Sequence, residues 1–297
     1  QAEAIVARLD LIEAVQQGFV EIQAAEAAIA VARERVRIAS ELEREVARRV
    51  ASGKDPIFAG TRAKTALTAA KVDLELAIHA RDAAIKRLAL LWGGPPEAPA
   101  VSVTEFLDLK SPESSAAASA ADLAVLEARI ARARATVDLQ RANAARDPTV
   151  SAGPRIISTR SIGAVAGVSM PLGGRRLAQA RIAEAEAEGR RAQAELALER
   201  HNRERAIVLA AERVEEARRE ALSIRDNVIP SANRTLEQVR FGYNRGFFNF
   251  ADVSAAQTTA IDARSRVVDA VRRYHEARVE LDRLAGRFTD LAQEGIQ

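Results

Sequence analysis

The chain has 297 residues, and nearly half of them are apolar although only 4% are aromatic. Alanine, leucine, arginine and glutamate recur throughout; they have high helix propensity, and the 44 basic and 41 acidic residues are mixed as on solvated helix faces, which argues against a nucleic-acid footprint. The lack of cysteine excludes disulfides, thiolate zinc sites and cysteine nucleophiles, and the lack of an apolar run of about 18 residues excludes a transmembrane helix.

The chain opens with the pattern of a helical hairpin. Apolar residues fall at spacings of three, four and seven, which is typical of a helix that packs along a neighbour: Ile12, Val15, Phe19, Ile22, Ile29 and Val36. A turn follows at Ser52–Pro56, and the same spacing resumes from Leu67 to Leu88. The run Trp92-Gly93-Gly94-Pro95-Pro96 ends the second helix. We expect a first helical repeat over 1–93, with its tip at Gly53.

A segment of different character follows. Residues 94–115 contain proline and serine and are expected to be an irregular or partly helical connection between repeats. A helix is predicted over 116–146, and Asp147-Pro148 ends it. Apolar and small residues then alternate with a period of two along Ile162, Ala164, Ala166, Val168 and Met170. That period predicts a strand, and residues 148–172 are expected to form a β-hairpin that turns near Ser158–Ser161.

Helical patterns occupy the rest of the chain. A long helix is predicted over 175–244, with Pro230 causing a kink or break inside it. After a tip at Gly246, a helix is expected over 250–286, where Val267, Tyr274, Leu281 and Phe288 lie seven residues apart, and residues 287–297 form a C-terminal tail.

The two helical hairpins are related by an internal duplication. A shift of 193 residues places Gly53 on Gly246 and Gly93 on Gly286, so a pair of glycines 40 residues apart occurs in both halves. The second repeat is therefore expected to span 116–286. Its long helix would be about 108 Å long, and the two shorter helices stacked end to end would match it. The fold class is mainly α, with long antiparallel helices lining a cylinder wall, the β-hairpin at one end and the glycine turns at the other.

This arrangement resembles the TolC family of outer-membrane efflux proteins. The likeness lies in the turn Tyr243-Asn244-Arg245-Gly246, the step Asp252-Val253, the run Ala256-Gln257-Thr258, the helix end Leu284-Ala285-Gly286, and the segments 146–153 and 168–175 around the hairpin. The resemblance implies a homotrimer with a periplasmic tunnel of helices and an outer-membrane β-barrel to which each hairpin contributes, so Ile162, Ala164, Ala166, Val168 and Met170 would form a membrane strand. It also implies a passive channel without a cofactor, which works with a periplasmic adaptor and an inner-membrane pump.

One branch of the family is similar in more detail. Residues Ser52-Gly53-Lys54, Thr61-Arg62-Ala63, Leu91-Trp92-Gly93 and Tyr274-His275 resemble the cobalt-zinc-cadmium (CzcC-type) branch. This resemblance implies that the chain works with a resistance-nodulation-division pump that exports heavy-metal cations. The alternatives are an outer-membrane channel for drug efflux or for type I secretion.

The resemblance also implies that this sequence is shorter at its N-terminus than the family pattern. The 193-residue shift places the end of the first copy's hairpin about 19 residues before Gln1. The first short helix, the first hairpin and a lipid-anchor cysteine would lie in that missing part. A trimer of this chain alone would offer six strands instead of twelve.

Candidate site residues concentrate at the two glycine turns. Asp252 matches the family aspartate of the closed tunnel end, where three copies would form a carboxylate ring that attracts cations; the alternative is that Asp252 caps its helix. The tips would dock the adaptor through Gly53, Lys54, Arg62, Arg245, Gly246, Phe247 and Phe248, and Arg49 would add to that contact. For Phe247, Phe248 and Phe250, packing inside the tip is the alternative to docking.

No residue pattern predicts a catalytic or metal centre. His79, His201 and His275 lie on separate predicted helices without metal-ligand spacing, and no nucleophile elbow, P-loop or dinucleotide fingerprint is present. A periplasmic adaptor and a structural coiled-coil protein are the rival classes. An adaptor would need more strand than this sequence offers, and the hairpin and punctuated turns argue against a plain coiled coil.

Overall fold

The structure is a computed structural model that describes residues 2–97, 99–110, 120–145, 149–158, 161–169 and 174–293. Helices dominate these residues, and their two strands form one antiparallel sheet, so the predicted mainly α fold class is confirmed. The chain divides into two compact units, a smaller one at 120–203 and a larger one made by the described residues of 3–119 and 204–297. Compactness is a different property from the sequence repeats expected at 1–93 and 116–286, and it groups the hairpin and the helix before it with the first part of the long helix.

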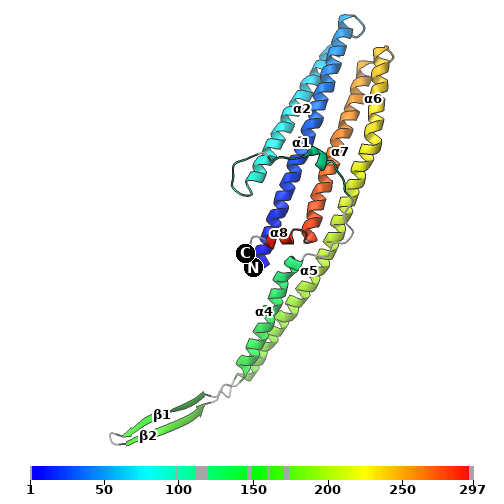
Figure 1. Ribbon diagram of the computed structural model, residues 1–297. Helices are drawn as coiled ribbons and strands as arrows, with labels where there is room; N and C mark the ends of the chain where they lie inside the picture. The colour runs from blue at the N-terminus through cyan, green and yellow to red at the C-terminus, as the bar shows by residue number, and fades with distance from the viewer. Residues whose placement is uncertain are drawn as a thin grey trace. The chain divides into compact units, whose positions relative to one another are not determined.

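The first hairpin of the larger unit consists of α1 (Ala2–Ala51) and α2 (Ile57–Ala89). The two helices run antiparallel and side by side (Figure 1). Ion pairs cross between them at Arg87–Glu21 (2.7 Å), Arg81–Glu26 (3.2 Å) and Arg35–Asp73 (2.7 Å). Between the helices, Gly53 has a φ of 70°, a conformation that suits glycine, and the Lys54 N–H donates to the Arg49 carbonyl at 2.9 Å.

The helix expected over 175–244 is not a uniform α-helix. It consists of α5 (Arg175–Ser223), a single π-helical turn η1 (Ile224–Val228) and α6 (Ile229–Asn244). Pro230 follows the π-turn directly. Because proline has no N–H and its ring crowds the carbonyl four residues back, the helix widens before it, and the Ile229 N–H donates to the Ile224 carbonyl five residues earlier. The sequence predicted a kink or break at Pro230; the helix instead accommodates the proline with a widened turn and continues as α6.

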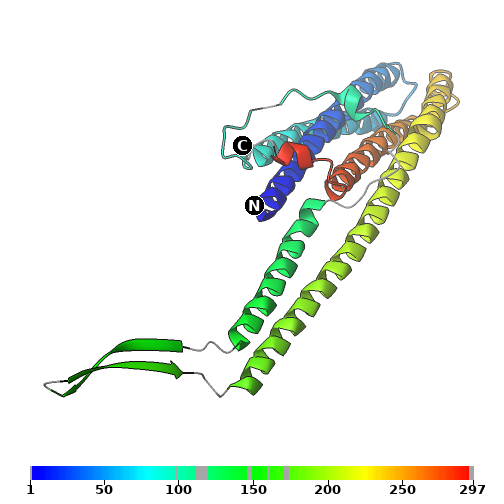
Figure 2. The same cartoon turned by 60° about the horizontal axis from the view of Figure 1, so that its bottom comes forward.

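The second hairpin of the larger unit consists of α6 and α7 (Phe250–Leu284). In both views α7 lies next to α1, with α2 and α6 on the outer sides (Figures 1 and 2). The last turns of α5 also pair with α7 through Arg213–Glu280 (2.8 Å) and Arg273–Glu220 (2.7 Å). After Gly286, the short α8 (Thr289–Gln293) ends the described chain, and the Arg8 guanidinium donates to the Ala292 carbonyl at 3.2 Å.

The one-turn helix α3 (Val103–Phe106) packs on the middle of this unit. Phe106 is fully buried in a cluster that draws on α1, α5, η1 and α7: Val20, Ala24, Ala27, Ala221, Ile224, Val268, Ala270, Val271 and Val279. Ser102 caps α3 by accepting a hydrogen bond from the Glu105 N–H at 3.3 Å.

The smaller unit contains α4 (Ala120–Ala144), the first part of α5, and the strands β1 (Thr149–Ser158) and β2 (Ser161–Ser169). Figure 2 shows α4 alongside α5. Ion pairs at Arg203–Asp122 (3.3 Å), Arg200–Glu127 (3.1 Å) and Arg141–Glu186 (2.8 Å) cross between these two helices in antiparallel order. In the sheet, Thr149 pairs with Ser169 and Ile156 with Ile162, with an irregularity between Ile156 and Ser158.

Several predicted positions lie outside the described residues. They are Met170, the hairpin limits Pro148 and Leu172, the helix ends 116–119 and Arg146, residues 111–115 of the connection, and 294–297 of the tail. Within the described part of the chain, no helix carries a stretch long and apolar enough to cross a bilayer.

Candidate functional site

The two glycine turns lie at the same end of the larger unit, and their helices share a small core (Figure 1). Tyr243, three residues before Gly246, is fully buried there. It packs among residues of α1, α2 and α7: Leu42, Val46, Ala59, Ala63, Phe250 and Val253. The side chain of Tyr243 therefore reaches from one hairpin into the other.

A polar group joins the hairpins at this core. The Asp55 carboxylate accepts two hydrogen bonds from the Arg49 guanidinium, at 3.0 Å from Nε and 3.1 Å from Nη2. The Tyr243 hydroxyl donates to Asp55 Oδ2, and Arg49 Nη1 donates to the Tyr243 carbonyl at 3.0 Å. The guanidinium also lies over the Tyr243 ring, with 4.2 Å from Cζ to the ring centroid. We name Arg49, Asp55 and Tyr243 the turn clamp.

The turn clamp is nearly closed to solvent, since the side chains of Arg49 and Asp55 are only 14% and 9% exposed. Burial would raise the pKa of the Asp55 carboxyl, but the hydrogen bonds from Arg49 and Tyr243 outweigh it and lower that pKa. Burial and the neighbouring carboxylate raise the pKa of the Tyr243 hydroxyl. At neutral pH the clamp therefore contains a charged carboxylate, a charged guanidinium and a neutral phenol.

The residues predicted to dock an adaptor surround the turn clamp at the surface. Gly53 and Gly246 have positive φ, at 70° and 80°, as their place in the turns predicts. Lys54 and Arg62 are exposed, and Arg62 lines a groove of about 470 Å³ between α2 and the start of α7. Arg245 is exposed and lies over the Phe241 ring at 4.0 Å. Arg49, in contrast, is engaged within the chain.

The three phenylalanines of the second turn have different surroundings. Phe250 is buried in the core beneath the turn clamp. Phe248 covers Gly242, where a Cβ atom would come within 2.3 Å of its ring. Phe247 is 75% exposed. Packing inside the tip thus explains Phe250 and part of Phe248, and leaves Phe247 at the surface.

Asp252 takes part in a capping box at the start of α7. Asn249 accepts hydrogen bonds from the N–H groups of Ala251 (2.7 Å) and Asp252 (3.2 Å), and the Asp252 carboxylate accepts one from the Asn249 N–H at 2.9 Å. The structure therefore shows the capping role that was one of the two readings of Asp252. Its side chain remains half-buried at the turn.

Sequence reasoning missed the partnership of Asp55 with Tyr243. The two residues are 188 positions apart. The tyrosine was noticed only as part of a turn motif, and the aspartate only as part of the first turn. The duplication could have indicated this contact, because it places the two turns in equivalent positions at the same end of the repeat.

The predicted membrane strand lies on β2, where Ala164, Ala166 and Val168 are exposed. Their cross-strand partners on β1 are Pro154, Ala152 and Val150. Val150 and Val168 face each other, and each is 72% exposed. The sheet therefore presents a face of small apolar side chains from both strands, of which the sequence analysis had identified only the β2 half.

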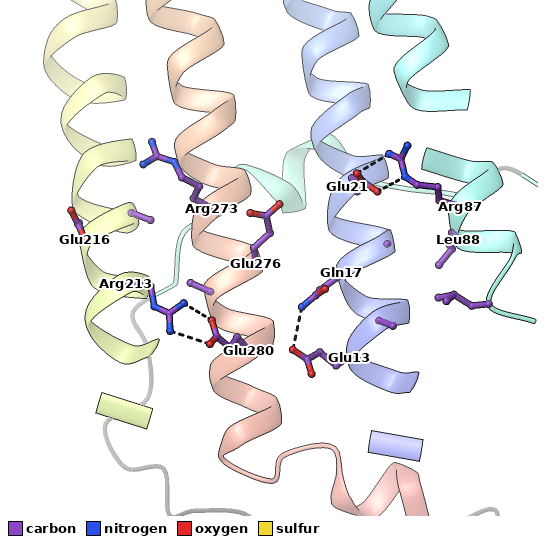
Figure 3. Close-up of a pocket in the computed structure, with 15 residues that line it drawn as sticks. Glu13, Gln17, Glu21, Arg87, Leu88, Arg213, Glu216, Arg273, Glu276 and Glu280 are labelled. Atoms are coloured by element: carbon purple, nitrogen blue, oxygen red, sulfur yellow. Dashed lines mark hydrogen bonds and ion pairs between the residues drawn. The ribbon is translucent and has the colours of Figure 1, made fainter. Parts of the chain in front are cut away.

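A second concave surface, of about 810 Å³, lies between α1 and α7 (Figure 3). Glu13, Gln17 and Glu21 line it from α1, and Glu276 and Glu280 line it from α7. Four of these five side chains have a partner that also lines the groove: Gln17 donates to Glu13, Arg87 donates to Glu21, and Arg213 donates to Glu280. Such an open, charge-lined surface differs from the apolar, enclosed pockets that bind small molecules. No group of three His, Asp or Glu side chains within the described ranges is arranged to hold a metal ion.

The chain is similar to known proteins in both sequence and fold. No family model matches the chain. The cobalt-zinc-cadmium resistance protein CzcC of Cupriavidus metallidurans is 27% identical over 294 residues, which cover 97% of this chain and 70% of that protein. The structure of CusC superposes with a TM-score of 0.79 at 16% identity, over 95% of this chain and 69% of CusC. The outer-membrane protein VceC of Vibrio cholerae gives 0.74 at 17% identity, over 96% and 72%.

The helical hairpins, the β-hairpin of the described residues and these likenesses together define the class by fold: the chain has the fold of CusC and of the outer-membrane protein VceC, as its resemblance to the TolC family predicted. Within that class, its sequence is similar along nearly its whole length to CzcC. The adaptor and coiled-coil alternatives lack this support.

Proposed function

We propose that the chain is one protomer of a homotrimeric exit channel that exports heavy-metal cations. It works with a periplasmic adaptor and an inner-membrane resistance-nodulation-division pump. The observation that carries this proposal is the likeness to a cobalt-zinc-cadmium resistance protein over 97% of the chain. The apolar face of β1 and β2 lies in the outer membrane, and the helices extend into the periplasm.

The turn clamp holds the tunnel end closed until a partner engages it. Its three side chains tie the α1–α2 turn to the α6–α7 turn, so the hairpins cannot separate while the Asp55 carboxylate keeps both donors. Because both charges are nearly buried, breaking the pair is costly unless new partners replace the lost bonds. Contact with the adaptor supplies the free energy, since the channel has no nucleotide-binding motif of its own.

The adaptor docks on the exposed surface around the clamp. Gly53, Lys54, Arg62, Arg245, Gly246, Phe247 and Phe248 form this docking surface. The exposed ring of Phe247 flanked by cationic side chains supports it, because an apolar anchor with a charged rim is typical of a protein interface.

Asp252 forms a ring of three carboxylates at the closed end of the trimer. Its capping hydrogen bond does not prevent this role, since a carboxylate has lone pairs for several partners. Such a ring attracts cations and repels anions.

Metal and drug cargo are distinguished by a resistance assay. The natural full-length protein, expressed with its pump and adaptor in a Gram-negative host that lacks its own channel, should raise tolerance to Co²⁺, Zn²⁺ and Cd²⁺. Protection against organic drugs without protection against these metals would contradict the proposed cargo. Protection against neither would contradict the channel.

The docking surface has a matched test in the same assay. Phe247→Ala should lower metal tolerance, because it removes the exposed anchor. Leu90→Ala, at the opposite end of α2 and 78% exposed, should leave it unchanged. Equal effects of the two substitutions would contradict docking at the turn.

A further inference from the structure

The pair Tyr274-His275, in the middle of α7, has a structural role that the turn clamp does not explain. Both side chains point to the segment of residues 102–110, which contains α3 and which we name the strap. Tyr274 is fully buried, and its hydroxyl donates to the Lys110 carbonyl at 2.7 Å. His275 Nε2 lies 2.8 Å from the Phe106 carbonyl. Because a carbonyl only accepts, Nε2 carries the proton and donates.

Phe106 is fixed in place on three sides. Its ring stacks on the His275 ring, with centroids 5.2 Å apart and an angle of 24° between the planes. Its carbonyl accepts the His275 hydrogen bond, and its side chain fills the cluster around α1 and α7. Two well-placed hydrogen bonds specify one position of the strap, where apolar packing alone would tolerate several.

The strap rests against the π-turn of the long helix. Ile224, the first residue of η1, belongs to the same buried cluster as Phe106, and Ile229 packs against that cluster from the start of α6. Charge links the two segments as well. The hydrogen bond that Arg225 donates to Asp226 raises the pKa of the Arg225 guanidinium most, and the negative charge of Asp108 in the strap raises it further.

A π-turn is a place where a helix can change direction at low cost. At Ile229 the backbone hydrogen bond spans five residues instead of four, and Pro230 has no N–H to donate in either the α-helical or the π-helical pattern. Kinks in long helices concentrate at such positions. What holds this turn in one geometry is therefore its packing, and the strap supplies part of that packing.

We propose that the strap is a clasp on a hinge at η1, in which Tyr274 and His275 hold Phe106 against the π-turn and so set the direction of α6 relative to the last turns of α5. Tyr243 lies in the last turn of α6, so the direction of α6 also sets the position of this member of the turn clamp. This inference rests on the proposed function only in assuming that the turn end moves when the channel opens.

Hydrogen exchange of the full-length protein in detergent tests the clasp without a transport assay. The double variant Tyr274→Phe/His275→Phe keeps both rings and removes both donors. Amide exchange over 224–231 should then accelerate about tenfold, the effect of losing hydrogen bonds of ordinary strength. His275→Gln, whose amide N–H can replace Nε2–H, should stay within about twofold of the unchanged protein.

Tyr243→Phe is the matched control. It removes a buried tyrosine donor of the turn clamp and should accelerate exchange at the turns while leaving 224–231 unchanged. Faster exchange over 103–110 with unchanged exchange over 224–231 in the double variant would overturn the proposal, because the strap would then be only a local cover.

A distance measurement separates hinge motion from local unfolding. Residues 1–297 contain no cysteine, so spin labels on this part of the protein can be placed at Leu209→Cys and Glu237→Cys, about 42 Å apart along a straight helix. In trimers with one labelled protomer, the double variant should broaden this distance distribution. An unchanged distribution together with faster exchange would also overturn the hinge.

Discussion

Tyr243 and Asp55 show how much one pair of side chains can contribute to the joining of two helical hairpins. The hydroxyl and the carboxylate meet inside an apolar cluster, and Arg49 balances the charge. Neither residue had a predicted partner, because nothing local in the sequence indicates a contact across 188 positions. The glycine turns that bring the two residues together were predicted, because a helix end that needs a positive φ favours glycine at that position.

A double-mutant cycle measures this pair. Asp55→Asn should lower the free energy of unfolding of the larger unit by about 3 kcal/mol, because it leaves the Arg49 charge nearly buried without its counter-ion. Tyr243→Phe should cost about 1 kcal/mol. Because both changes remove the same hydrogen bond, the double variant should cost clearly less than their sum in chemical denaturation. Additive effects would show that Tyr243 and Asp55 act independently.

The two roles of Asp252 can be separated by substitution. Asn249→Ala should lower the free energy of unfolding by about 1 kcal/mol, as expected for the loss of a helix cap, and leave ion selectivity unchanged. Asp252→Asn keeps a side-chain oxygen for the cap but removes the charge, so it should cost less stability and reduce the preference for cations. Selectivity is measured as a reversal potential in a salt gradient. An unchanged reversal potential in Asp252→Asn would reduce Asp252 to a cap.

His275 gives the stability of the larger unit a dependence on pH. Burial lowers the pKa of its imidazole, as does the charge of Arg278, while the hydrogen bond to the Phe106 carbonyl acts in the opposite direction. Below the ordinary histidine pKa of about 6.5, the unfolded chain therefore takes up this proton before the folded chain does. The free energy of unfolding should fall as the pH drops from 7 toward 5. Denaturation of His275→Gln across this range should show a weaker fall, and an equal slope would contradict a buried neutral His275.

At the scale of elements, the ends of the helices were the most predictable features. Glycine and proline mark them through backbone conformation alone, and Gly53, Gly93, Gly246 and Gly286 all have positive φ. The π-turn was not predictable in kind, because a proline inside a helix permits a kink, a break or a widened turn, and packing selects among them. Phe106 could not be placed from the sequence either, since a one-turn helix in an irregular segment leaves no periodic signal.

A pair of glycine substitutions tests this reading of the turns. Gly246→Ala should lower the free energy of unfolding by about 1 kcal/mol, because a Cβ atom is strained at its φ of 80° although space is open around it. Gly189→Ala, on α5 with open space around it and without a positive φ, should stabilise its helix by about 0.5–1 kcal/mol. Thermal unfolding followed by circular dichroism checks both signs. Stabilisation by both substitutions would contradict a strained turn.

At the scale of the whole molecule, the duplication predicted two hairpins of the same design. It did not predict the boundary near residue 203, where the chain changes from one compact unit to the other. That boundary falls within α5, because one continuous helix belongs to both units. The periodicity of apolar residues shows which face of a helix is buried, but it does not indicate which neighbouring helix each turn contacts. The likeness to CusC and VceC supports the same arrangement of hairpins at identities of 16% and 17%, where the pattern of helices is retained and most side chains have changed.

In the proposed function, the chain forms a passive channel whose end is held closed by the turn clamp. The most direct test is the single-channel conductance of the full-length protein in planar lipid bilayers, compared with Asp55→Asn and Tyr243→Phe. Discrete channels of low conductance are expected for the unchanged protein, with a several-fold larger conductance in both variants. Channels whose conductance is the same in all three proteins would contradict the clamp, and the absence of channels from all three would contradict the conduit itself.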